Sequence, residues 1–417
     1  MKKWQVLLSA AVLAAGIGFG GISQAAETAE PAAASAVATE VSDSVKGKIW
    51  GSHVVELPVI TEIDYAEGLA ADDALLGRYV GCSLISKVLD NADMIVGRSM
   101  DFYFSNRPAY ILRTAVPGYY KTVGLAYNAL AGPTFEEVEK NGISEKDISG
   151  MIFFTTDVMN EKGLYVEANM RPEEPEEETG IKPSSGTNPG AEYRMSFIAL
   201  IRFLGERAAN VDEAVALAKT VDVHGMKTEH SEWGGALFLA DPSGHHGLLE
   251  LVDNKLVWTD GAVGHTNFYY SDGYRDKAKY GNGYGRFEVL VKGIDAVKTE
   301  RDMMDLIYKV RYTQLIRPET CAFNPLTEFT GIESPAFEKF GGKLTAEVAM
   351  DPANHDELMK TAMAAFADKR DWTLQQLRDD GTLWQSQFQV VANCNKKNLH
   401  VMCFEDPELV FDFAVEK

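Results

Sequence analysis

The sequence predicts an α+β protein in which antiparallel sheets are covered by helices. Apolar, β-branched segments joined by short polar turns predict hairpins, and pairs of helical segments separate one group of hairpins from the next. Apolar residues form 46% of the 417-residue chain and charged residues 24%, which is typical of a globular protein with a sizeable core.

The first 25 residues have the order of an export signal. Lys2 and Lys3 precede an apolar stretch from Val6 to Phe19, which ends at the small residues around Ala25. The stretch is shorter than the roughly 20 apolar residues of a membrane span, and no Cys follows the expected cut to carry a lipid. We therefore expect an exported protein, periplasmic or extracellular, without a membrane anchor.

The stretch that follows differs in composition from the rest. Ala26 to about Ser52 is rich in Ala, Glu, Thr and Ser without sustained periodicity, which predicts a flexible, solvated segment. An apolar run from Val54 to Ile60 is more ordered in character. The expected parts of the chain are thus a signal of residues 1–25, a segment of residues 26–81 and one domain of residues 82–417.

The first strong hairpin places three reactive side chains together. Strand-like segments flank the turn Asp90–Asp93, so a hairpin centred near residue 91 sets Cys82 opposite Met100 or Asp101, about 5 Å away. Arg98 lies one or two steps along, where it can lower the pKa of the thiol, and Asp101 can accept hydrogen bonds near Cys82. A cysteine is more commonly a buried apolar residue than a nucleophile, but these neighbours favour the nucleophile.

The later elements continue the alternation of hairpins and helices. Strands are expected at Met151–Val158, Leu164–Met170, Ala236–Ala240, Leu248–Val252, Lys255–Thr259, Gln385–Asn393 and Leu399–Phe404. Helices are expected at Ser196–Arg207, after the cap Asn210, at Arg286–Val297 and after the capping-box pair Thr299 and Asp302. The acidic, Pro-containing run Pro172–Glu178 predicts a loop.

Charge and cysteine usage exclude several classes of function. Lys and Arg number 40 against 61 Asp and Glu, a formal charge of −21, so we expect no nucleic-acid partner. The scattered His residues show no HExxH or Cys-pair spacing, so neither a metal nor another cofactor is expected. The four cysteines, Cys82, Cys321, Cys394 and Cys403, are too few for a disulfide framework, and a bridge between Cys394 and Cys403 is not favoured, because the last hairpin does not set them opposite each other.

Taken together, the motifs resemble the choloylglycine hydrolase family, the cysteine branch of the N-terminal nucleophile hydrolases that includes bile salt hydrolases and penicillin V acylases. The resemblance covers nearly all of residues 82–417. It is carried by Gly81-Cys82-Ser83-Leu84, Gly97-Arg98-Ser99-Met100-Asp101-Phe102, Asn160-Glu161-Lys162-Gly163-Leu164, Gly264-His265-Thr266-Asn267 and Gly283-Tyr284-Gly285-Arg286-Phe287.

This resemblance implies a four-layer α-β-β-α sandwich and an enzyme whose first residue is its cysteine. Because Cys82 is internal, it implies that the bond between Gly81 and Cys82 is cut after export, by Cys82 itself, and that residues 26–81 are removed. The free α-amine of Cys82, with an unperturbed pKa near 8, would then be the base that no neighbouring His supplies. The family also implies a homotetramer.

The resemblance assigns roles residue by residue. It implies that Cys82 attacks the substrate carbonyl to form a thioester, that Arg98 lies beside the thiol, and that Asp101 orients the Cys82 amine or sulfur. It also implies that Asn267 is an oxyanion donor and that Arg286 completes the polar network. Asn169 would be a second oxyanion donor, and Met170 is the alternative position if the strand register differs by one.

The implied activity is hydrolysis of a linear, non-peptide amide such as a bile acid conjugate, penicillin V or an N-acyl amino acid. The substrate stays open, because selectivity lies in loops. Acyl transfer to an amine and a non-catalytic exported binding protein are the alternatives. The acidic run Glu173–Glu178 would disfavour anionic conjugates if it bordered the entrance, and a solvated loop remote from the site is the other interpretation.

Overall fold

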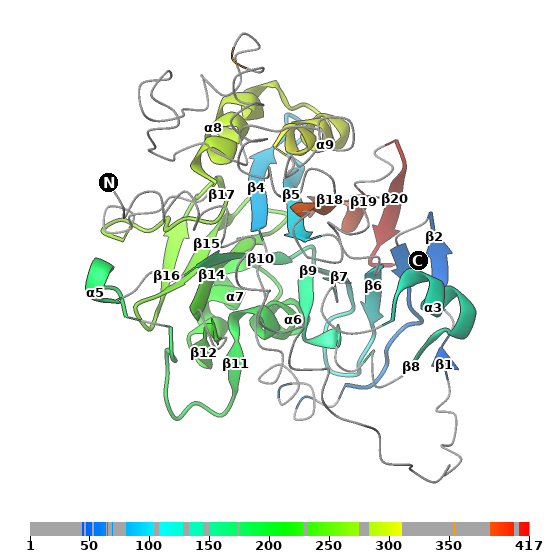
Figure 1. The fold of residues 1–417 in the computed structure, drawn as a ribbon, viewed down its shortest axis with the longest axis horizontal. Helices are drawn as coiled ribbons and strands as arrows, with labels where there is room; N and C mark the ends of the chain where they lie inside the picture. The colour runs from blue at the N-terminus through cyan, green and yellow to red at the C-terminus, as the bar shows by residue number, and fades with distance from the viewer. Residues whose placement is uncertain are drawn as a thin grey trace, which may run out of the picture.

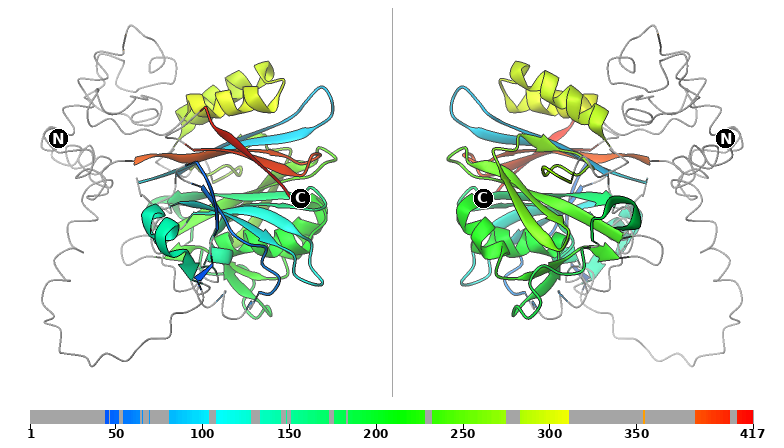
Figure 2. Two further views of the ribbon diagram at one scale, coloured as in Figure 1. Left: turned by 90° about the vertical axis from the view of Figure 1, so that its right-hand side faces the viewer. Right: turned by 90° about the vertical axis from the view of Figure 1, so that its left-hand side faces the viewer.

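Two stacked β-sheets lie between two layers of helices in the computed structural model (Figures 1 and 2), which confirms the four-layer α+β arrangement. The expected signal, residues 1–25, and Cys321 lie outside the described residues. The structure describes residues 44–45, 47–51, 54–63, 65, 69, 81–103, 108–127, 133–144, 148, 151–172, 176–182, 184–227, 232–274, 283–310, 354, 384–403 and 408–416.

The larger sheet has ten strands among the residues that the structure describes. In spatial order they are β16 (Lys255–Asp260), β15 (His246–Val252), β14 (Glu232–Ala240), β10 (Tyr165–Pro172), β9 (Thr155–Asn160), β7 (Thr122–Tyr127), β6 (Ala109–Thr114), β3 (Val54–Glu56) and β2 (Lys48–Trp50), with β13 (Met226–Lys227) paired to β14. On its outer face, α6 (Phe197–Arg207) packs on β9, β10 and β14, and α7 (Val211–Ala218) packs on α6 and β14.

In the described part of the chain, the smaller sheet has six strands. Their order is β17 (Gly264–His265), β4 (Gly81–Val88), β5 (Met94–Tyr103), β18 (Trp384–Asn393), β19 (Asn398–Cys403) and β20 (Val410–Ala414). On its outer face, α8 (Tyr284–Gly293) packs on β4, the 3-10 helix η1 (Ile294–Ala296) follows, and α9 (Glu300–Lys309) packs on β5 and β18 (Figure 2).

Short elements complete the fold. β1 (Ser44–Val45) pairs with β8 (Ile143–Ser144), and β11 (Arg194–Ser196) pairs with β12 (Asp222–His224). The described helices also include α3 (Phe135–Asn141), whose Val138 packs with Tyr110 and Leu112 of β6, and the short helix α5 (Glu176–Thr179). Among the residues that the structure describes, no helix is long and apolar enough to cross a membrane.

Predicted helix caps and hairpin turns account for much of this arrangement. The side chain of Ser196 caps α6, that of Asn210 caps α7 by accepting from Glu213 N, and Thr299 with Asp302 forms the capping box of α9. One apolar core fills the space between the sheets and a second lies between the larger sheet and α6. The sheets and α6 are therefore fixed relative to one another by burial of apolar side chains.

Four expectations about local structure differ from the fold. The segment to Ser52 was expected to be flexible, but β1 and β2 are strands. Met151 and Ile152 are helical and buried, so the strand expected at Met151 begins at Thr155; a short apolar run has the same pattern in either element. The acidic run includes α5, since Glu favours helix. The larger sheet is mixed, because β3 and β6 are parallel.

Candidate active site

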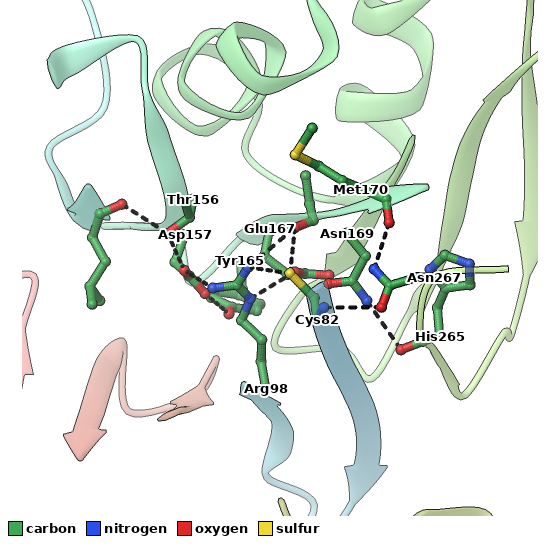
Figure 3. A network of polar contacts seen from close by, with 12 residues as sticks. Cys82, Arg98, Thr156, Asp157, Tyr165, Glu167, Asn169, Met170, His265 and Asn267 are labelled. Atoms are coloured by element: carbon green, nitrogen blue, oxygen red, sulfur yellow. Dashed lines mark hydrogen bonds and ion pairs between the residues drawn. The ribbon is translucent and has the colours of Figure 1, made fainter. Parts of the chain in front are cut away.

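Cys82 lies on β4 at the position that the predicted hairpin gives it. The pairing of β4 with β5 sets Cys82 opposite Met100 and Gly81 opposite Asp101. Two residue pairs further on, Arg98 lies opposite Leu84, so it projects to the same side of the sheet as Cys82, and its Nη2 donates to Cys82 Sγ at 3.3 Å (Figure 3). Both side chains are fully buried between the sheets.

The guanidinium of Arg98 links the two sheets. From β5, Nη1 donates to Asp157 Oδ2 on β9 at 2.8 Å, and Nε donates to Glu167 Oε2 on β10 at 3.1 Å. Nη2 also donates to Ala168 O at 3.2 Å. The hydroxyl of Tyr165 donates to Asp157 Oδ1 at 2.5 Å. One buried cation thus meets two carboxylates and the candidate nucleophile.

A second cluster holds the backbone of Cys82. Its N donates to Asn267 Oδ1 at 3.1 Å, and its O accepts from Arg286 Nη1 at 3.0 Å. Arg286 also bonds Asn267 Oδ1 through Nη2 at 2.8 Å and Asp101 Oδ2 through Nη1 at 3.0 Å. The hydroxyl of Ser386 donates to Asp101 Oδ1. Four of the predicted site residues therefore lie in one hydrogen-bonded group.

The position of Asp101 differs from the expected one. Within the described part of the chain, no hydrogen bond joins Asp101 to Cys82, and Arg286 lies between them. The reason is the register, which sets Gly81 and not Cys82 opposite Asp101. In this continuous chain Asp101 therefore orients the arginine that holds Cys82.

A glycine allows Arg286 to reach the site. Gly283 precedes α8 in a left-handed conformation, with φ of 82°. A Cβ at this position would lie 2.7 Å from Arg286 Nη2 and 2.6 Å from Thr266 Oγ1, closer than real Cβ contacts allow. The motif glycine is thus needed both for its backbone angle and for the close approach of the guanidinium.

Asn169 lies at the site, and the side chain of Met170 does not. Met170 packs in the core between the sheet and α6, whereas Asn169 lies beside Cys82 and Asn267 (Figure 3). Asn169 Nδ2 donates to His265 O at 3.1 Å, and Asn267 Nδ2 donates to Met170 O at 2.6 Å. Each amide nitrogen, the atom that an oxyanion donor uses, therefore keeps one N–H beyond its bond to a carbonyl.

The electrostatics favour the neutral thiol in the continuous chain. Burial raises the pKa of Cys82 to about 12; Arg98 acts in the opposite direction, and the nearby carboxylates add to the rise. Arg98 lowers the pKa of the Cys82 thiol, as expected, but desolvation raises that pKa by a larger amount. A thiol in this environment must give up its proton to a neighbouring group as it attacks a carbonyl.

Two carboxylates of the site were missed by sequence reasoning. Burial raises the pKa of Glu167 to about 8, against the pull of Arg98, with Asp157 adding to the rise. Glu167 Oε1 has no hydrogen-bond partner among the described residues. Tyr165 and Glu167 lie two positions apart on β10, and Asp157 lies on β9; a polar residue at an alternating position of a strand indicates on its own a solvated face. Acidic residues inside apolar strands were the available signal.

Neither a metal site nor a disulfide is found among the residues described. No group of three or more potential metal ligands occurs there. Cys82, Cys394 and Cys403 are buried, and no disulfide bond joins the last two.

The chain is similar in structure to hydrolases of known fold. A variant of the conjugated bile acid hydrolase from Clostridium perfringens matches with 12% identity and a TM-score of 0.41, over 80% of this chain and 92% of that one. The penicillin V acylase from Agrobacterium tumefaciens matches with 15% identity and a TM-score of 0.37, over 81% of this chain and 87% of that one. No protein-family model and no curated protein matches the chain.

Proposed function

We propose that this protein hydrolyses linear, non-peptide amides with Cys82 as its nucleophile. The observation that carries the proposal is the pair of clusters around Cys82: Arg98 contacts the sulfur, while Asn267 and Arg286 hold the backbone N and O. The resemblance of the motifs to choloylglycine hydrolases supports bile acid conjugates, penicillin V or N-acyl amino acids as substrates.

The first step is cleavage of the chain before Cys82. The sulfur attacks the carbonyl carbon of Gly81, the bond from that carbon to Cys82 N breaks, and the nitrogen takes up the proton that the thiol loses. Gly81 is then a thioester on Cys82. Water hydrolyses this thioester, which restores the thiol and gives Gly81 a carboxylate. Cys82 is left with a free α-amine, the base that the neutral thiol requires.

In amide hydrolysis, bonds form and break in the same sequence as in the cleavage of the chain. The α-amine takes the thiol proton, the sulfur attacks the substrate carbonyl, and the second N–H groups of Asn267 and Asn169 stabilise the oxyanion. The proton passes to the departing amine as the carbon–nitrogen bond breaks. Water then hydrolyses the acyl thioester, and the acid leaves.

The test begins with the N-terminus of the protein recovered from the producing cells. Mass spectrometry is expected to find Cys82 as the first residue of the larger chain, outside the cytoplasm. That material is then assayed with glycine- and taurine-conjugated bile acids, penicillin V and N-acyl amino acids, with release of the free acid as the measured product. Full amidase activity in a chain still joined at Gly81 and Cys82 would contradict the proposal.

A further inference from the structure

The residues before the proposed cut form part of the larger sheet. The described residues of 44–69 are called the N-terminal segment here. Its strand β3 pairs in parallel with β6, and the ladder continues beyond β3: Leu57 N donates to Ile111 O at 3.0 Å and Ile60 N to Arg113 O at 2.8 Å. Val54 and Val55 are completely buried. The segment therefore contributes both backbone pairing and core side chains.

A second attachment crosses from the larger sheet to the smaller one. Trp50 on β2 lies with its ring centroid 5.4 Å from that of Phe413 on β20, in an edge-on arrangement. Its Nε1 donates to Glu56 Oε2 at 3.0 Å, and Glu56 Oε1 pairs with Arg113 Nε at 2.8 Å. Arg113 in turn donates to Ala414 O. The segment thus joins the edges of both sheets on the side where β2 and β20 are neighbours (Figure 1).

Tyr65 makes a third attachment, to α6. Its hydroxyl donates to the buried carboxylate of Glu206 and accepts from Arg207 Nη1 at 2.9 Å. The Arg207 guanidinium lies 4.3 Å from the centroid of the Tyr65 ring, and Phe153 packs against its edge at 5.3 Å. A buried carboxylate that lost this hydroxyl would lose a hydrogen bond that water does not easily replace.

We infer that the N-terminal segment is not discarded after the cut but stays in the sheet as a second, non-covalently held chain. Strand pairing and side-chain burial do not require the bond between Gly81 and Cys82. Loss of the segment would leave β6 as an exposed edge strand and uncover Tyr110, Ile111 and Leu112, which are now buried. The inference rests on the proposed function only for the cut itself, and it replaces the expectation that residues 26–81 leave.

The test separates retention of the segment from self-cleavage. A full chain with Cys82→Ala receives a recognition sequence for a site-specific protease within residues 71–80 and is cut by that protease. Gel filtration under native conditions is expected to give one peak, in which denaturing mass spectrometry finds both fragments in equal amounts. An N-terminal fragment that elutes apart from the rest overturns the inference. The proposed function is tested separately with the chain without substitutions. If that chain neither cuts itself nor hydrolyses an amide, the proposed function fails while the inference about the segment still stands.

A matched pair of valines tests which contacts hold the segment. Val55 is completely buried and Val59 is 53% exposed, although they lie four positions apart in the same segment. After the protease cut, Val55→Asp is expected to release the fragment and Val59→Asp to retain it. If Val55→Asp does not fold, Tyr65→Phe keeps the ring and removes only the hydroxyl, and its fragment is expected to dissociate faster on dilution. Equal retention of the fragment by Val55→Asp and Val59→Asp would show that these contacts do not hold the segment. The same conclusion would follow if the Tyr65→Phe fragment dissociated as slowly as the unaltered one.

Discussion

Two buried arginines link neighbouring layers of the molecule, and they are partnered differently. Arg202 on α6 donates to Thr122 Oγ1 at 2.9 Å, Ile152 O at 3.0 Å and Thr155 Oγ1 at 3.1 Å, and pairs with the single carboxylate of Glu206 at 3.2 Å. Arg98 meets two carboxylates and a thiol between the sheets.

The pKa values of the two guanidinium groups shift in opposite directions. Burial lowers the pKa of Arg202 to about 9. For Arg98 burial acts in the same direction, but Asp157, Cys82 and Glu167 together raise its pKa above the usual value. Hydroxyl and carbonyl partners suit a group that holds layers together, while several titratable partners suit one that controls a neighbouring proton.

The largest effect is expected from removing the thiol, the partner that Arg202 lacks. Cys82→Ala is expected to abolish both cleavage before residue 82 and amide hydrolysis, because both begin with attack by the same sulfur. The matched control is Cys394→Ala, which alters an equally buried thiol elsewhere in the fold and is expected to keep both activities. Intact mass and product release measure the two activities. Residual hydrolysis in Cys82→Ala would assign the chemistry to another residue.

Asn267→Ala tests whether the site includes an oxyanion donor in addition to Arg98 and Cys82. Loss of an oxyanion donor elsewhere costs about 100-fold to 1000-fold in kcat, and a loss of that size is expected here because Asn267 also holds Cys82 N. Asn398→Ala, at a nearly buried asparagine on β19, is the control and is expected to keep kcat. A value of kcat within about twofold of the unaltered enzyme would remove Asn267 from the site.

Conservative substitution of the two arginines tests the comparison directly. Lysine keeps the charge but not the planar group of donors. Arg98→Lys is expected to lower kcat/KM by about tenfold to 100-fold, the equivalent of one charge-assisted hydrogen bond. Arg202→Lys is expected to lower Tm while leaving kcat/KM near that of the unaltered protein. If both variants lose activity in proportion to their loss of Tm, Arg98 has only a structural role.

The smallest effect concerns pH. Burial raises the pKa of both Glu167 and Glu206 to about 8 from 4.5. Between these values the unfolded chain releases a proton that the folded chain keeps, so the free energy of unfolding falls as pH rises from about 4.5 to about 8. Below this window both states are protonated, and the effect disappears.

Glutamine variants should separate the two glutamates. Glu167→Gln and Glu206→Gln are each expected to reduce the loss of unfolding free energy across the pH window, by about a few kcal/mol at most. Each variant should therefore show a smaller fall in Tm over the same window. Only Glu167→Gln is expected to shift the pH–rate profile as well, because only Glu167 shares Arg98 with the nucleophile. An identical pH–rate profile in both variants would make Glu167 a structural residue.

The sequence predicted the part of the site that a single hairpin sets. The turn after β4 determines the register, so the relative positions of Cys82, Arg98 and Met100 follow from local sequence alone. Asp157 and Glu167 were not foreseen, because they come from the other sheet, 59 and 69 positions from Arg98, and no local pattern encodes such a separation.

The N-terminal segment was misjudged for a different reason. β1 and β2 are two and three residues long, too short for alternation to be visible in a stretch rich in Ala, Glu and Thr, whereas β3 lies in the apolar run Val54–Ile60. What makes β3 a strand is the open edge of β6, a partner that exists only once the sheet has formed. Its order is therefore a tertiary effect and not a local propensity.

The proposed cut would change how β3 is held against β6. In the continuous chain, β3 is joined to β6 through the β4–β5 hairpin of the other sheet, so its effective concentration at the edge is high and independent of dilution. After the proposed cut that tether would no longer exist, and binding of the segment would follow mass action. Thermal stability of the mature protein should then depend on its concentration, as for a heterodimer, although both chains derive from one gene product.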